Sequence, residues 1–185
     1  MIDMKTGRFT WGDGLELYPG MTREDFFKSK IYAEELKNEK DKENLTKWQY
    51  SLKKQNIDGM EMSVLIRFSS HDYVEEIIIT KPEFYNWPNW PEDIPFKEYA
   101  YGIKAYNDEF VRRQTESTGG VHALPGCFPS ESWGYIRSNI SLIHTPSIEV
   151  VIRYDEIPFL EKKGYDFSKY SLLEILEMDN VPKEK

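Results

Sequence analysis

Cys127 is the residue best suited to nucleophilic chemistry. A thiolate needs a nearby base to take its proton, and His122 stands five residues earlier while His144 follows later. Catalytic cysteines and histidines meet through the fold rather than through short spacing, and Pro125-Gly126-Cys127-Phe128-Pro129 is typical of a loop. We therefore expect an inert or partly buried thiol. A hydrolase that pairs Cys127 with His122 or His144 is the alternative.

Metal and phosphate sites need patterns of ligands that are not evident here. The histidines are His71, His122 and His144, and none stands at the short spacing that metal ligands share. Gly119-Gly120 follows a predicted helix and has no Gly-Lys-Ser/Thr beside it, so it is expected to end the helix rather than to hold a phosphate.

Carboxylate pairs, which glycosidases use as acid and base, are abundant but not diagnostic. Glu75-Glu76 and Asp155-Glu156 are such pairs, yet in a chain with 32 acidic residues they are expected on solvated faces. The sequence also lacks the Gly-x-Ser-x-Gly turn that carries a nucleophilic serine. We predict no catalytic residue, no metal and no cofactor, and favour a protein that is not an enzyme.

The segment 84–93 is the most distinctive local feature. It places Trp87 and Trp90 next to Glu92 and Asp93 on a backbone stiffened by proline. Rigid aromatic side chains are enriched at binding sites, and the adjacent acids would select a basic partner. We predict these four residues as a partner-binding site; the alternative is that the indoles fold back onto the sheet edge or the helix start.

The charge composition of the chain indicates which class of molecule it can bind. With 24 Lys and Arg against 32 Asp and Glu, the net charge is -8, which repels nucleic acid and attracts basic proteins. One cysteine, no secretory signal at the N-terminus and no apolar run of membrane-spanning length predict a cytoplasmic protein without a membrane segment.

Hydrophobic periodicity predicts the elements that must position these residues. Alternating runs predict three hairpins, and apolar residues at steps of three and four predict a long amphipathic helix. The charged stretch 34–47 is predicted as a solvated helix or a loop. The predicted strands span 8–11, 15–18, 48–52, 60–68, 73–80, 133–143 and 148–154, and the predicted helices span 22–29, 96–115 and 171–178.

Antiparallel hairpins beside one long helix, without βαβ alternation, indicate an α+β fold. We predict a mainly antiparallel sheet of hairpins with the amphipathic helix packed on it. A chain of 185 residues suits one domain over 1–185, ending in a short flexible tail.

Two short pieces resemble a known group of proteins. Tyr18-Pro19-Gly20-Met21-Thr22-Arg23-Glu24-Asp25-Phe26 and Trp133-Gly134-Tyr135-Ile136 resemble uncharacterised bacterial α+β proteins of the immunity type, which are found beside polymorphic toxins. The first piece also resembles the helix entry of small cell-envelope lipoproteins, whose lipidated signal this chain lacks. The matched residues shape a turn and a strand, so no functional residue is carried over.

These observations lead to one expectation and two alternatives. We expect a non-enzymatic protein-binding protein, an immunity protein that neutralises a basic toxin. The alternatives are the Cys/His hydrolase and a carbohydrate- or peptide-binding module that uses Trp87 and Trp90 as stacking platforms.

Overall fold

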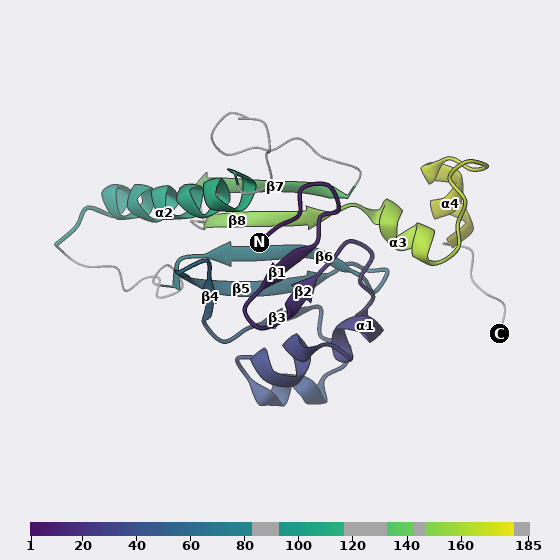
Figure 1. Cartoon of the computed structure of the whole chain (residues 1–185), viewed down its shortest axis with the longest axis horizontal. Coiled ribbons are helices and arrows are strands. Elements are labelled where there is room, and N and C mark those ends of the chain that lie inside the picture. The colour runs from purple at the N-terminus through teal and green to yellow at the C-terminus, as the bar shows by residue number, and fades with distance from the viewer. Residues whose placement is uncertain (83–92, 117–132, 143–146, 180–185) are drawn as a thin grey trace.

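A computed structural model describes residues 1–82, 93–116, 133–142 and 147–179 (Figure 1). It confirms the predicted α+β class: antiparallel strands form the sheets, and one long helix packs on the larger sheet. The strands are β1 (Phe9–Trp11), β2 (Leu15–Leu17), β3 (Gln49–Ser51), β4 (Gln55–Ile57), β5 (Met60–Phe68), β6 (Val74–Thr80), β7 (Gly134–Ser141) and β8 (Ser147–Tyr154). The helices are α1 (Arg23–Phe27), η1 (Ile31–Glu35), η2 (Glu39–Glu43), α2 (Phe96–Glu116), α3 (Glu156–Lys162) and α4 (Leu172–Asp179).

The larger sheet has six strands in the order β3-β5-β6-β8-β7, with β4 also paired to β5. The predicted hairpins β5–β6 and β7–β8 meet through β6 and β8, where Ile77 pairs with Ile152. Every pairing is antiparallel. These two predicted hairpins therefore join into one sheet, in which β7 is an edge strand.

One face of this sheet is apolar because side chains alternate along each strand. In β5 the buried positions are every second residue, from Met60 to Phe68. Their neighbours across the strands continue the same face, including Ile77 and Ile79 of β6 and Val150 and Ile152 of β8.

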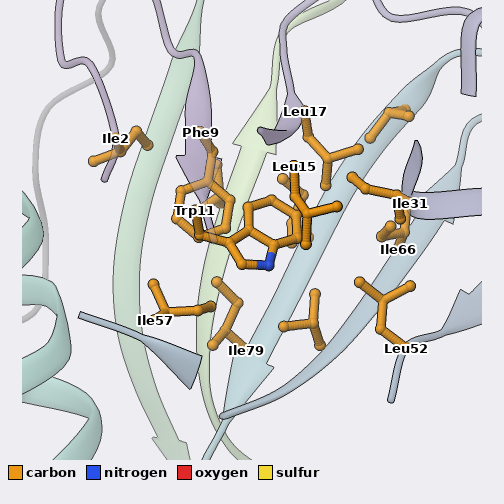
Figure 2. Close-up of a cluster of buried hydrophobic side chains, with 14 of the residues drawn as sticks. Ile2, Phe9, Trp11, Leu15, Leu17, Ile31, Leu52, Ile57, Ile66 and Ile79 are labelled. Carbon is orange, nitrogen blue, oxygen red and sulfur yellow. The ribbon is translucent and has the colours of Figure 1, made fainter. Parts of the chain in front are cut away.

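The β1–β2 hairpin and α2 cover this same face. Phe9 and Trp11 from the hairpin belong to one buried cluster with Phe110 and Val111 of α2 and with the sheet residues. Figure 2 shows part of this cluster, with Phe9 and Trp11 among sheet residues that include Ile66 and Ile79. The Trp11 indole N–H donates to Gln55 Oε1 at 2.8 Å, so its polar atom is satisfied within the core. Burial of each such large side chain contributes roughly 1.5–3 kcal/mol, which holds the hairpin on the sheet.

The Trp133-Gly134 pair fixes the start of β7 against the N-terminus. The Trp133 indole N–H donates to Met4 O at 2.8 Å. Gly134 has φ of 131°, and a Cβ there would lie 1.9 Å from Arg153 O, so a side chain has no room. This glycine allows the backbone of β7 to approach β8 closely.

Helix α2 confirms the predicted helix over 96–115. Its inward positions include Ala100, Ile103 and Phe110. Asn107 is also buried, and its side-chain amide donates to Ile148 O at 3.2 Å, which ties the helix to β8. Within the described residues, no helix is both long enough and apolar enough to cross a bilayer.

The opposite face of the sheet carries ion pairs. Arg67 Nη1 lies 2.9 Å from Glu76, and Arg153 Nη2 lies 2.8 Å from Glu75. The register of the β5–β6 pairing shifts between Arg67 and Phe68. Glu75 and Glu76, which lie opposite this irregularity on β6, each form an ion pair with an arginine. The pair Glu75-Glu76 thus joins three strands electrostatically.

Three features differ from the predicted elements. Strand β4 was not predicted, although the Asp58-Gly59 turn after it, with φ of 51° and 77°, is a strong hairpin signal. Helix α3 was also missed because it is short and has Pro158 in its first turn. The charged stretch 34–47 contains the end of η1 and the short helix η2, which buries Asp41 against Lys47 at 2.7 Å.

Tyr154 generates a prediction about stability. Its ring is buried, and in the described part of the structure its hydroxyl has no hydrogen-bond partner. A buried unpaired hydroxyl costs about 1–3 kcal/mol, so Tyr154→Phe should raise the free energy of unfolding by about 1 kcal/mol in urea denaturation.

The matched control is Tyr50→Phe. The Tyr50 hydroxyl donates to Asn44 O at 2.8 Å, so its removal should lower the free energy of unfolding by about 1 kcal/mol. Equal losses for both variants would show that the Tyr154 hydroxyl is paired.

Candidate functional site

The predicted partner-binding residues fall mainly outside the described ranges. Trp87, Trp90 and Glu92 lie there, as do Cys127, His122 and His144. Asp93 is described and is exposed just before α2. The predictions that rest on the undescribed residues stay predictions.

Chemistry-bearing side chains gather instead at the turn between β5 and β6. Residues 21–23 run antiparallel to 72–74: Arg23 N donates to Asp72 O and Val74 N donates to Met21 O, both at 2.8 Å. Asp72 has φ of 63°, so the backbone bends sharply there. This pairing places Arg23, at the start of α1, beside the Asp72 side chain.

Thr22 fixes the start of α1. Its hydroxyl accepts a hydrogen bond from Asp25 N at 3.1 Å, and the Asp25 carboxylate accepts one from Thr22 N at 3.1 Å. This reciprocal capping confirms the predicted helix start and typically contributes about 1 kcal/mol. Arg23, the next residue, is therefore held on a defined backbone.

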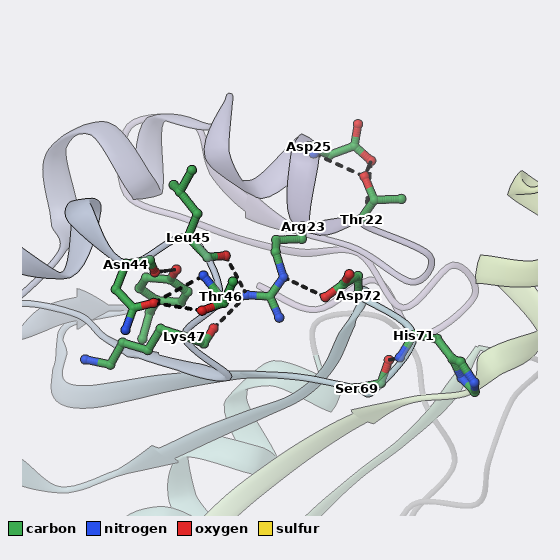
Figure 3. Close-up of polar contacts among 11 residues, drawn as sticks. Thr22, Arg23, Asp25, Asn44, Leu45, Thr46, Lys47, Ser69, His71 and Asp72 are labelled. Atoms are coloured by element: carbon green, nitrogen blue, oxygen red, sulfur yellow. Dashed lines mark hydrogen bonds and ion pairs between the residues drawn. The ribbon is translucent and has the colours of Figure 1, made fainter. Parts of the chain in front are cut away.

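The Arg23 guanidinium binds three groups at once (Figure 3). Its Nε donates to Asp72 Oδ1 at 2.8 Å, and its Nη1 donates to Lys47 O at 2.6 Å and to Leu45 O at 3.4 Å. Its cation also lies 4.4 Å from the centre of the Phe68 ring, and the side chain is only 14% exposed. A planar, permanently charged fork suits such a set of acceptors better than lysine does.

These bonds hold residues 44–48, which we name the display loop. The Asn44 side-chain oxygen accepts bonds from the N–H and the hydroxyl of Thr46, at 3.2 and 3.0 Å, and Phe68 N donates to Trp48 O at 2.9 Å. The backbone is thus fixed along its length.

The display loop exposes two large apolar side chains. Leu45 is 54% exposed and Trp48 is 58% exposed. Figure 3 shows the Leu45 side chain pointing away from the Arg23 guanidinium, and Arg67 lies 5.5 Å from the centre of the Trp48 ring. Both exposed side chains are carried by a fixed backbone, which lowers the entropic cost of any contact that they make.

The other side chains at the turn connect it to α3. His71 Nδ1 contacts the Glu156 carboxylate, and the Tyr73 ring stacks on Phe159 with 4.6 Å between ring centres. Burial raises the pKa of Tyr73 well above its usual range, with a further rise from the negative charges of Glu156 and Glu75. The phenol therefore stays protonated and cannot act as a base at neutral pH.

This arrangement does not activate a nucleophile. Ser69 Oγ accepts from the backbone N–H of His71 at 3.1 Å, while the His71 ring contacts Glu156. No hydrogen bond joins a hydroxyl or thiol to a histidine ring across the described ranges, and no group of three or more potential metal ligands occurs there. The turn therefore serves as a structural junction between the display loop and α3.

We compared the chain with models of protein families, with curated proteins and with solved structures. None of these comparisons found a match. The resemblance to immunity proteins thus stays a prediction, and the function has to be argued from the geometry of the described residues.

Sequence reasoning missed the display loop for identifiable reasons. Trp48 was placed in an alternating strand run that begins one residue later, at Gln49. Asn44 and Thr46 carry a recognisable turn signal, which alone could have marked the loop. The role of Arg23 had no sequence signal, because its acceptors lie more than 20 residues away along the chain.

The Arg23 contacts generate a second prediction. Arg23→Gln removes the charged fork, and the free energy of unfolding should fall by about 2 kcal/mol because the charge-assisted hydrogen bonds of a largely buried guanidinium are lost. Hydrogen exchange at residues 44–48 should also become faster than in the unchanged chain.

The matched control is Arg8→Gln, because Arg8 pairs with Glu16 on the surface with both side chains more than 40% exposed. Its effect should stay within about 0.5 kcal/mol. Unchanged exchange in the display loop of the Arg23 variant would contradict the role assigned to Arg23.

Proposed function

We propose that this chain is a non-enzymatic protein-binding protein of the immunity type, which neutralises a basic toxin by covering its active surface. The observation that supports this best is the display loop, where Trp48 and Leu45 stand exposed on a backbone held by Arg23. Rigid aromatic side chains bury much area at little entropic cost and dominate the energy of many interfaces.

The charge of the chain supports a basic partner. A net charge of -8 speeds the encounter with a cationic protein and slows that with an anionic one. In this proposal the long-range field sets the association rate, whereas Trp48 and Leu45 supply the short-range apolar contact.

The aromatic segment with Trp87, Trp90, Glu92 and Asp93 is the second proposed contact. Its one described member, Asp93, is exposed and therefore accessible to a basic group. The hydrolase alternative and the aromatic-platform module rest on residues outside the described ranges, so no observation favours them over protein binding.

The test co-expresses the chain with the product of its neighbouring gene, which the proposal requires to be basic and toxic, and measures both growth and affinity. Trp48→Ala should weaken binding by about 30-fold, since a central aromatic residue contributes about 2 kcal/mol or more. Protection of growth should fall in parallel, and the affinity of the unchanged chain should decline as salt is raised.

Tyr101→Ala is the control, because Tyr101 is 51% exposed on α2 and presents a similar aromatic group elsewhere. It should bind and protect like the unchanged chain. If the neighbouring product neither binds nor loses toxicity in the presence of the unchanged chain, the immunity proposal fails.

A further inference from the structure

The chain contains two Asp-Gly pairs that the structure places in different surroundings. Asp13-Gly14 lies at the tip of the β1–β2 hairpin, and Asp58-Gly59 forms the turn between β4 and β5. In such a pair the glycine nitrogen can attack the carboxyl group of the aspartate, because glycine carries no side chain to block the approach. The rate of this reaction in a folded chain depends on how freely the two groups can meet.

The reacting groups of the first pair are free to move. The Asp13 side chain is fully exposed, and its carboxylate lies 3.2 Å from Lys30 Nζ in an ion pair open to solvent, which is weak. The Gly14 N–H donates no hydrogen bond to any described residue. Apart from its chain neighbours, no heavy atom lies within 4 Å of the position that a Cβ on Gly14 would take. The nitrogen and the carboxyl group of this pair can therefore meet.

The reacting groups of the second pair are both held. The Gly59 N–H donates to Asn56 Oδ1 at 3.0 Å, and the Asp58 carboxylate accepts a hydrogen bond from the Gln114 side chain of α2. Arg113 of α2 also donates to Asp58 O at 3.2 Å. The hydrogen bonds of the nitrogen and of the carboxylate have to break before these groups can react. The two dipeptides are thus identical in chemistry and differ in restraint.

We propose that Asp13-Gly14 is a site of spontaneous isomerisation to isoaspartate, and that the fold protects Asp58-Gly59 from the same reaction. The Gly14 nitrogen attacks Cγ of Asp13 in its carboxylic acid form. The N–Cγ bond forms, the Cγ–OH bond breaks, and the hydroxyl leaves with the amide hydrogen as one water molecule, which gives a succinimide.

Hydrolysis of the succinimide completes the reaction. Water adds its hydroxyl to the former backbone carbonyl carbon of Asp13, the bond from that carbon to Gly14 N breaks, and the nitrogen takes up the hydrogen. The product is an isoaspartyl residue. Addition of water at Cγ instead restores the aspartate, so the two forms exchange through one intermediate.

Isomerisation leads the backbone through the Asp13 side chain. The hairpin tip gains one backbone carbon, and the former carbonyl group of Asp13 becomes a free carboxylate. Lys30 Nζ already donates to Asp13 O at 2.9 Å, so its ammonium group faces the position of the new charge. The open space around Gly14 accommodates the longer turn, while Trp11 and Leu15 on either side are buried. We therefore expect the modified chain to keep its fold.

The experiment incubates the full chain in warm, neutral buffer for several weeks and digests samples with trypsin. Peptides 9–23 and 55–67 each contain one aspartate, so chromatography and electron-transfer fragmentation quantify the isomers at each site. Isoaspartate should form at least about tenfold faster at Asp13 than at Asp58, because two hydrogen bonds must first break at the second site.

Three controls assign this difference to the fold. In concentrated urea both sites should react at similar rates, since the dipeptides are identical. Asn56→Ala removes the acceptor of the Gly59 N–H and should raise the rate at Asp58 while leaving the rate at Asp13 unchanged. Asp13→Glu keeps the charge but requires a larger ring, so isomerisation at this position should fall below detection.

Equal rates at the two sites in the folded chain, or a faster reaction at Asp58, would overturn the proposal. So would the absence of isoaspartate at Asp13 in the folded chain, because the hairpin would then restrain the pair that is assigned as free. These measurements need no partner, so their outcome is independent of the toxin proposal.

Discussion

The apolar face of the six-stranded sheet has to be covered across its width, and this requirement decides where most other elements lie. The β1–β2 hairpin and α2 share the task, and residues from both belong to one buried cluster with the sheet. Because both lie on the same face, the opposite face is free to carry the ion pairs of Arg67 and Arg153. One apolar layer thus supports the rest of the architecture.

The turn between β5 and β6 is held by the buried apolar face of the sheet. It also contacts the segments that carry the exposed side chains. Phe68, at the end of β5, packs in the core and also lies under the Arg23 guanidinium. From there Asp72 binds Arg23, which holds the display loop, while His71 and Tyr73 contact α3. Exposed side chains on both sides of the turn are therefore carried by a rigid sheet, which keeps the entropic cost of binding low.

Much of the fold could be predicted from the sequence because local patterns and the final packing agree. Strand β5 alternates strictly, β6 is rich in β-branched residues, and α2 repeats its apolar residues at steps of three and four; the structure confirms all three. Short elements such as β4 and α3 were missed, since three to seven residues give too little periodic signal.

The candidate site was less predictable than the fold. Composition and missing motifs directed attention to Trp87 and Trp90, which lie outside the described residues, whereas the exposed indole among the described residues is that of Trp48. The backbone just before Trp48 is held by Arg23, whose acceptors Lys47 O and Asp72 Oδ1 come from two distant segments. Such contacts join residues that are far apart in the sequence, so no fixed spacing of residues reveals them before the tertiary fold is known.

The central claim is that the display loop is a preorganised protein-binding surface. Hydrogen exchange of the chain, alone and saturated with the toxin proposed as its partner, tests it most directly. The account predicts that the Thr46 and Lys47 amides exchange slowly in the free chain, because they donate to Asn44 Oδ1 and Asn44 O on a backbone that Arg23 holds, and more slowly still in the complex. A complex whose protected residues lie entirely elsewhere, with the display loop unchanged, would contradict the account.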